Sequence, residues 1–404
     1  MKEKSGFFQV LGINRDDKKN LQEIAHKIGI STKSLLFYND NGILPPSNEL
    51  VIIAAFFGIN QFQIMIGMGV YSQELKDLLS QRASEIAKDI TVPETPKLEN
   101  HKAVFRTTLG ELFEGDCLSL MAGMQSNSVD LVFADPPFNL SKLYPSNMDD
   151  NVSSVEYIGW TEQWLSECIR ILKPGGSLFL WNLPKWNTYF SEFLNHRLSF
   201  RHWISVDIKY SLPISSKLYP SHYSLLYYVK QEKPSVFKPD RLKMDTCPHC
   251  FKELRDYGGY KDKMNPKGIN MADVWYDIPP VRHAKYKKRK DANELSIKLL
   301  DRIIEMASNE GDVIFDPFGG AGTTYLVAEL KKRRWIGIEL GPTEIIVDRL
   351  VNKAEELEYL NQYRDNYNKL FPDKIKKERL KRMLWTSDSF IKSEADFILE
   401  MKLV

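Results

Sequence analysis

The fold of this chain is decided by residues 129–138, which read Val-Asp-Leu-Val-Phe-Ala and then Asp135-Pro136-Pro137-Phe138. Prolines cannot donate ladder hydrogen bonds, so the apolar run predicts a buried strand that ends at Asp135. This stop leaves a carboxylate and an aromatic ring at the carboxyl edge of a sheet, where open α/β folds bind their ligands. Such an edge suits a planar substrate with an amino group; a polar strand end with a proline turn is the alternative interpretation.

A second pattern lies far downstream, at residues 313–324, which read Val-Ile-Phe-Asp-Pro-Phe-Gly-Gly-Ala-Gly-Thr-Thr. Glycines let the backbone approach a ligand closely, and the N-terminus of the expected helix 325–330 attracts negative charge. The next expected strand, 334–339, ends in Glu339, which is placed to accept hydrogen bonds from ribose hydroxyls. The spacing Phe-x-Gly-x-Gly differs from the dinucleotide fingerprint. Strand, turn, helix, strand and terminal acid together are far more specific than a glycine turn alone.

The order of these two motifs resembles that of the amino-group (N6-adenine or N4-cytosine) DNA methyltransferases whose catalytic motif precedes the cofactor motif, the permuted β order. The resemblance extends over residues 107–356. It implies an α/β, Rossmann-like methyltransferase fold with circularly permuted motifs, S-adenosyl-L-methionine as cofactor and double-stranded DNA as partner. It further implies a possible homodimer and, for a restriction-modification or phage-type enzyme, a cognate restriction endonuclease.

The resemblance also assigns roles to residues of the two motifs. The implied catalytic residues are Asp135, Pro136, Pro137 and Phe138. The implied cofactor-binding residues are Asp116, Asp316, Phe318, Gly319, Gly320, Gly322, Thr323 and Glu339. Asp116 can equally serve as the N-cap of the helix that follows it. Residues 293 and 294 are expected at the start of a helix over 292–308, where the family more often has a lysine-proline pair.

Methylation of an exocyclic amine requires orientation and charge placement, because the lone pair of this nitrogen is delocalised into the ring. Asp135 and the Pro136 carbonyl would accept the two amino hydrogens, while Phe138 would stack on a base flipped out of the duplex. Aspartate at the first motif position favours adenine N6, and cytosine N4 is the alternative. An RNA or protein methyltransferase, or a transcriptional regulator with an inert methyltransferase domain, are further alternatives.

Residues 1–90 are interpreted as a helix-turn-helix DNA-binding domain, in which residues 19–59 are patterned as helices without visible catalytic chemistry. Apolar residues at helical spacing over 21–30, with Gly29 at a turn and Ser31 as a cap, predict a helix-turn-helix order. This segment resembles the DNA-binding domains of phage-type repressors, which implies that Ser31, Thr32, Lys33 and Phe37 face the major groove. A small helical bundle used for dimerisation or packing is the alternative.

The remaining segments suggest DNA contacts at several places. Residues 91–106 are interpreted as a linker, 107–356 as the catalytic domain, 231–290 as an insertion for target recognition, and 357–404 as a charged helical segment. A basic run with interleaved aromatic residues near the end of the insertion suits a phosphate backbone. The further candidates for DNA contact are Lys142, Lys217, His222, Arg282, Lys285, Lys287, Lys288 and Arg289.

Composition sets the outer limits of these interpretations. The 404 residues allow more than one domain, and a net charge of +2 means that any basic surface is local. Cys247 and Cys250 have half of a zinc-site spacing without a second pair, so we expect no metal. We see neither a membrane-spanning stretch nor a secretory signal pattern and expect a cytoplasmic protein.

Overall fold

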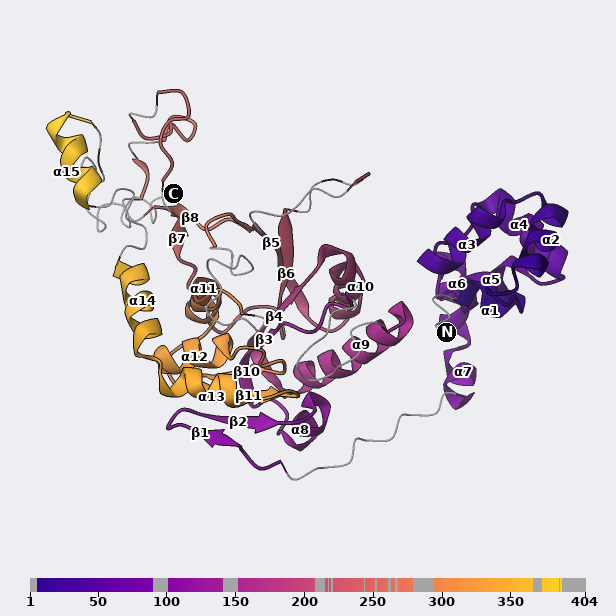
Figure 1. Cartoon of the computed structure of the whole chain (residues 1–404), viewed down its shortest axis with the longest axis horizontal. Helices are drawn as coiled ribbons and strands as arrows, with labels where there is room; N and C mark the ends of the chain where they lie inside the picture. The colour runs from indigo at the N-terminus through magenta and orange to yellow at the C-terminus, as the bar shows by residue number, and fades with distance from the viewer. Residues whose placement is uncertain are drawn as a thin grey trace. The chain divides into compact units, whose positions relative to one another are not determined.

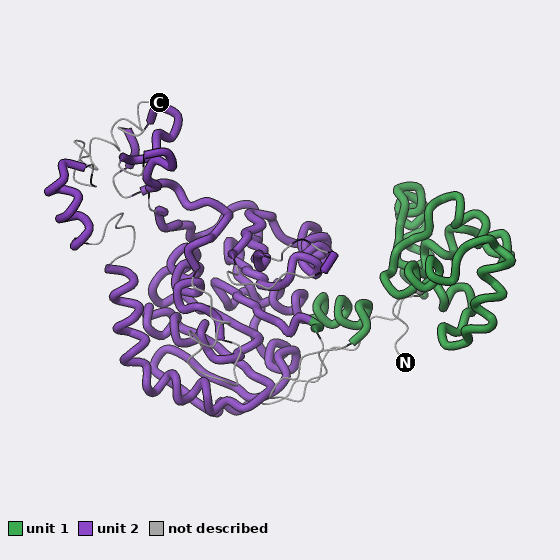
Figure 2. The backbone as a smooth tube through the Cα atoms, turned by 45° about the horizontal axis from the view of Figure 1, so that its top comes forward, with its two compact units in different colours: residues 1–96, 139–143, 149–163 green, residues 97–138, 144–148, 164–404 purple. Residues whose placement is uncertain are grey.

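The computed structural model describes residues 6–89, 101–140, 152–207, 221–242, 244–250, 253–260, 263–265, 268–278, 294–365 and 373–384, with 215, 216, 218 and 386. The chain forms two compact units (Figure 2). The first comprises residues 1–96, 139–143 and 149–163, and the second comprises residues 97–138, 144–148 and 164–404.

The N-terminal part of the first unit is helical (Figure 1). Its helices are α1 (Gly6–Leu11), α2 (Lys18–Ile28), α3 (Thr32–Asn41), α4 (Ser47–Phe57), α5 (Gln61–Gly67), α6 (Gln73–Gln81) and α7 (Ala83–Asp89). Helix α2 ends at Gly29, whose φ of 69° is left-handed and therefore favours glycine. Helix α3 begins after Ser31, whose hydroxyl accepts a hydrogen bond from the Ser34 amide at 3.0 Å. The expected helix, glycine turn and capped helix are therefore present.

The second unit is built on one mixed sheet, whose strand order in the described residues is β1-β2-β11-β10-β3-β4-β6-β5-β9. Its strands are β1 (Phe105–Arg106), β2 (Gly110–Glu114), β3 (Val129–Ala134), β4 (Leu172–Asn182), β5 (Ser199–Asp207), β6 (His222–Val229), β9 (Val274–Trp275), β10 (Val313–Asp316) and β11 (Arg334–Glu339). A separate pair is formed by β7 (Arg241–Leu242) and β8 (Ile269–Asn270). The expected insertion thus supplies β9, which pairs with β5.

The topology brings the two motif strands side by side (Figure 1). Strand β10 pairs in parallel with β3, with Ile314 opposite Leu131 and Phe315 opposite Val132, and β11 pairs in parallel with β10. Only β6 is antiparallel to both of its neighbours, β4 and β5, among the described strands between β2 and β9. Because β3, β10 and β11 run in the same direction, their carboxyl ends meet at one edge.

The other described helices are α8 (Cys117–Gly123), α9 (Ser154–Ile171), α10 (Pro184–Asn195), α11 (Ile297–Ala307), α12 (Thr323–Leu330), α13 (Glu344–Val351), α14 (Ala354–Asp365) and α15 (Asp373–Lys381). The apolar faces of α11 and α12 join the sheet side chains in one buried cluster, which includes Leu131, Ile303, Ile314 and Leu326. Burial of such faces is the main source of stability in a domain of this kind.

Strand β4 begins at Leu172, directly after α9, and its register against β3 shifts between Val129 and Leu131. Gly175, with φ of 77°, lies in this irregular stretch of β4. One expected boundary was wrong. Helix α11 begins after Ser296, so Glu294 precedes the helix instead of starting it.

Among the described residues, no single helix is long and apolar enough to cross a bilayer. The bent pair of α4 and α5 reaches the necessary length and apolar composition only when the two helices are taken together.

Candidate active site

Asp135 lies where β3 emerges from the core. The strand residues Phe133 and Ala134 are fully buried, and Asp135 is half-buried just beyond them. The following loop is held by Trp186 of α10, whose indole Nε1 donates to the Phe138 carbonyl at 2.8 Å. The Phe138 ring lies 6.0 Å from the Tyr223 ring and is only 8% exposed. Both ends of the Asp-Pro-Pro-Phe segment are thus fixed, one by the strand and the other by α10.

The glycine turn after β10 is organised by Asp316. This buried carboxylate accepts hydrogen bonds from the Thr324 hydroxyl at 2.5 Å and from the Phe318 amide at 3.0 Å. Burial raises the pKa of Asp316 well above its usual value, and the nearby charges of Asp135 and Glu339 raise it further against those two hydrogen bonds. Because β3, β10 and β11 run in the same direction, the carboxylates of Asp135, Asp316 and Glu339 stand at one edge of the sheet.

Glu339, at the end of β11, closes the other side of the turn. Its carboxylate accepts the Gly320 amide at 2.6 Å and the Gly341 amide at 3.0 Å. Each carboxylate oxygen can accept two hydrogen bonds, so capacity remains for the hydroxyls of a ribose. Gly322 has φ of 72°, and a Cβ there would lie 2.7 Å from Cγ2 of Ile346, so both conformation and packing require glycine.

Aromatic and capping contacts complete the surroundings. The Phe318 ring meets Trp164 edge-on, with 5.0 Å between ring centroids. Asp116 caps α8, accepting hydrogen bonds from the amides of Leu118 at 2.9 Å and Ser119 at 3.2 Å. The capping role expected for Asp116 is therefore confirmed, and its cofactor role stays a prediction.

This set of groups fits S-adenosyl-L-methionine. The cofactor carries a cationic sulfonium and two ribose hydroxyls, and the carboxylates at this edge supply hydrogen-bond acceptors. Gly319 and Gly320 let the backbone approach a ligand, and the buried Thr323 begins α12 directly after the turn. Asp316 shapes the turn through its own hydrogen bonds, and Glu339 keeps acceptor capacity for direct contacts.

Of the other predicted residues, His222 is exposed at the start of β6, at the same edge of the sheet as Asp135 and next to Tyr223, which contacts Phe138. In the N-terminal helices Ser31, Lys33 and Phe37 are exposed and Thr32 is half-buried. The candidates outside the described residues are Lys142, Lys217, Arg282, Lys285, Lys287, Lys288 and Arg289. Cys247 is half-buried and Cys250 exposed, and the described residues contain no group of three side chains that could hold a metal ion.

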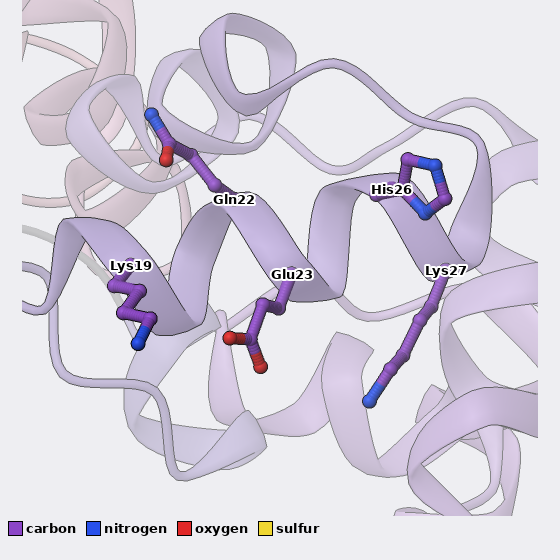
Figure 3. A pocket seen from close by; sticks show the side chains of 5 residues that line it. All are labelled: Lys19, Gln22, Glu23, His26 and Lys27. Carbon is purple, nitrogen blue, oxygen red and sulfur yellow. The ribbon is translucent and has the colours of Figure 1, made fainter.

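A shallow hollow of about 400 Å³ lies on α2 in the N-terminal unit (Figure 3). Its lining residues are Lys19, Gln22, Glu23, His26 and Lys27. All five come from one exposed helix face, whereas a built ligand site draws side chains from several elements. The carboxylate edge of the second unit, and not this hollow, has the arrangement of an active site.

Several supporting residues escaped the sequence reasoning. Trp186, Tyr223, Thr324 and Arg349 hold the two loops through tertiary contacts. A weak signal was available for Thr324, because a hydroxyl at the start of a helix commonly bonds a nearby carboxylate. No local pattern marks the other three.

Comparison with known proteins places the chain among DNA-modifying enzymes. A family model described as "DNA methylase" matches residues 129–347. The Type II methyltransferase M.BamHI of Bacillus amyloliquefaciens is 46% identical over 397 residues, covering 95% of this chain and 94% of that protein. The DNA adenine methyltransferase YhdJ of Escherichia coli strain K12 is 31% identical over 241 residues, covering 57% and 78%. Among solved structures, the PvuII DNA methyltransferase (cytosine-N4-specific) matches with a TM-score of 0.45 and 19% identity, covering 65% of this chain and 94% of that one.

Proposed function

The chain belongs to the DNA methylase family and depends on S-adenosyl-L-methionine, and from this we propose that it is a type II, site-specific enzyme that methylates the exocyclic amino group of a base in duplex DNA. The observation that carries the proposal is the parallel pairing of β3 with β10, which sets Asp135 beside the turn at Asp316. Similarity to M.BamHI along 95% of the chain supports the type II assignment and, with it, a cognate restriction endonuclease as partner. A homodimer stays a prediction.

The proposed mechanism relies on acceptors fixed before the reaction. S-adenosyl-L-methionine supplies, when bound, the electrophilic methyl group. Asp135 and the Pro136 carbonyl accept the two amino hydrogens, which draws the nitrogen toward tetrahedral geometry and frees its lone pair. Its proton leaves after methylation has made the nitrogen acidic, so Asp135 needs no unusual basicity. Phe138 stacks on the flipped base, and its contact with Tyr223 holds the ring in place.

The permuted motif order is part of the proposal. The catalytic strand β3 precedes the cofactor strands β10 and β11 in the chain, yet β10 lies directly between β3 and β11 in the sheet. This arrangement supports one methyltransferase domain whose two halves follow in exchanged order. The proposed domain limits are those expected from the sequence. The compact units differ from them, because α14 (Ala354–Asp365) runs across residue 356 within the second unit and residues 139–143 and 149–163 fall in the first unit.

Two target atoms are compatible with this mechanism: adenine N6, which Asp135 favours, and cytosine N4. Both bases present an amine beside a ring nitrogen, so the same acceptors can serve either. We expect expression in a methylation-free bacterial host to introduce one modified nucleoside, read by mass spectrometry of digested genomic DNA. N6-methyladenine would support the adenine assignment, and N4-methylcytosine would replace it while retaining the mechanism. If neither nucleoside were found, the DNA methylation proposal itself would fail.

We also propose that the N-terminal helices bind DNA as a helix-turn-helix domain. The left-handed turn at Gly29 and the cap at Ser31 support this assignment. Lys33 and Phe37, spaced one turn apart on α3, are both exposed, as a recognition face requires. The exposed face of α2 carries Lys19 and Lys27, which suits neighbouring phosphates (Figure 3).

Lys33→Glu tests this N-terminal assignment. We expect about tenfold weaker binding to DNA at low salt and a shallower dependence of binding on salt, because a phosphate contact becomes a repulsion. Mobility shift measurements over a salt series would show it. Lys76→Glu on α6 makes the same charge change at another exposed position of this unit and should have a smaller effect. Equal effects of the two variants would indicate only a general charge attraction.

A further inference from the structure

Arg349 on α13 is a fully buried cation whose role the proposed mechanism does not include. Its side chain is 1% exposed, and its guanidinium forms a bidentate pair with Glu356 at 2.8 to 3.0 Å. A second carboxylate, Glu294, lies 3.5 Å from Nη2 and is 7% exposed. Taking such charges out of water is costly, and a well-packed apolar replacement is often equally stable. Stability alone therefore gives no sufficient reason for this arrangement.

The third nitrogen of the Arg349 guanidinium, Nη1, is directed at the glycine turn after β10. Nη1 donates to the Ala321 carbonyl at 2.9 Å and to the Thr323 hydroxyl at 2.7 Å. These acceptors lie on either side of Gly322, the left-handed residue of the turn. The planar guanidinium can donate hydrogen bonds to a carboxylate from one side and to two other oxygens from another side. A lysine ammonium cannot make the same set of hydrogen bonds, because it is a compact point charge.

Three separate segments meet at this guanidinium. Glu294 precedes α11, Ala321 and Thr323 belong to the turn, and Glu356 belongs to α14. The Thr323 hydroxyl in turn donates to the Leu295 carbonyl at 3.3 Å, which ties the first two segments directly. The turn is thus held from outside by side chains that are far from it in the sequence.

The neighbouring residue Ile346 adds a steric limit on the same face of α13. A Cβ on Gly322 would lie 2.7 Å from its Cγ2, and a Cβ on Gly319 would lie 3.0 Å from its Cδ1. Residues three apart on a helix share one face, so Ile346 and Arg349 support the turn together. The Ile346 side chain limits how closely the turn approaches α13, and the Arg349 guanidinium fixes the orientation of the turn.

We propose that Arg349 is a positioning residue for S-adenosyl-L-methionine, which keeps the turn at residues 316–323 in its binding conformation through Ala321 and Thr323. The proposal rests on this cofactor and is independent of which base is methylated. A turn already held in place binds its ligand without a cost of ordering, so loss of the clamp should appear mainly in cofactor affinity.

Arg349→Lys is the direct test, because it retains the charge and removes the planar fork. We expect the full-length variant to bind S-adenosyl-L-methionine about tenfold more weakly in calorimetric titration without DNA, since about two hydrogen bonds from a charged group are disturbed. KM for the cofactor should rise by a similar factor, while kcat at saturating cofactor and KM for DNA should stay within about twofold of the wild type.

Arg302→Lys is the matched control. Arg302 on α11 is also fully buried and forms a bidentate pair, but its carboxylate partner is Asp277 of the insertion and not a residue of the clamp on the turn. We expect it to lower the melting temperature like Arg349→Lys and to leave cofactor affinity unchanged. Unchanged affinity in Arg349→Lys, or equal losses in both variants, would refute the positioning role.

A milder variant keeps the test decisive if Arg349→Lys does not fold. Glu356→Gln leaves both hydrogen bonds from Nη1 to the turn and weakens only the opposite side of the clamp. An intermediate loss of cofactor affinity is expected, and wild-type affinity would count against the proposal. A wild-type protein that binds the cofactor but methylates no DNA would instead refute the proposed function.

Discussion

Asp135→Ala is expected to lower the rate of DNA methylation by about a hundredfold to a thousandfold, the usual effect of removing one fixed polar group that stabilises a transition state. The carboxylate would accept one amino hydrogen of the target base, and its removal leaves only the Pro136 carbonyl of the two proposed acceptors after β3. Single-turnover methylation of an oligonucleotide bearing the recognition site, at saturating cofactor, would measure the effect on the chemical step.

The same variant should retain the cofactor. The turn at residues 316–323 is held by Asp316, Glu339 and Arg349, so we expect the dissociation constant for S-adenosyl-L-methionine to change by less than about threefold. Glu310→Gln, at an exposed acid whose nearest cation is 3.9 Å away, serves as the control and should leave the rate unchanged. Full methylation activity in Asp135→Ala would exclude the proposed mechanism.

Asp277→Ala should be the most destabilising of these substitutions, lowering the free energy of unfolding by about 3 to 5 kcal/mol. Asp277 pairs with the fully buried Arg302 through contacts of 2.6 and 3.0 Å, and Lys298 lies 2.7 Å from the same carboxylate. The variant leaves the buried guanidinium without this carboxylate. It also loosens the end of the insertion, since the Arg302 guanidinium lies 4.9 Å from the Trp275 ring of β9. Urea denaturation at neutral pH would measure the loss.

A control variant in the same insertion distinguishes the loss of a buried ion pair from the loss of an exposed one. Asp245 pairs with Arg255 at 3.4 Å, and both side chains are about half exposed. We expect Asp245→Ala to cost less than about 1 kcal/mol, as is usual for a pair in water. Equal destabilisation by the two variants would show that burial of Arg302 is not the source of the effect.

The Asp277 pair also makes stability depend on pH in a defined direction. Burial disfavours the charged carboxylate, but the hydrogen bonds and charges of Arg302 and Lys298 outweigh it and hold the pKa of Asp277 well below its usual value. The pair therefore contributes fully above the unfolded-state pKa of about 4, and the contribution is lost as pH falls toward the folded-state pKa. The difference between wild type and Asp277→Ala should accordingly shrink below about pH 4.

The sequence alone determined the local elements of the active site. An apolar run that stops at Pro136 requires a strand end, and the glycines before Thr323 require a turn that leads into a helix. Glu339 could be placed at the end of β11, and Ser31 at the start of α3, for the same reason. In each case the deciding interaction acts between residues only a few positions apart, so the element can be predicted from the sequence without knowledge of the fold.

Only the tertiary structure decided how these elements act together. The pairing of β3 with β10 joins Asp135 to the turn at Asp316, although the two motifs lie far apart in the chain. The same is true of Trp186 on the Phe138 carbonyl and of Arg349 between Glu294 and Glu356. Such contacts depend on sheet order and on the burial of charge, which are properties of the whole packed unit. They leave no periodic or compositional trace around the residues that make them.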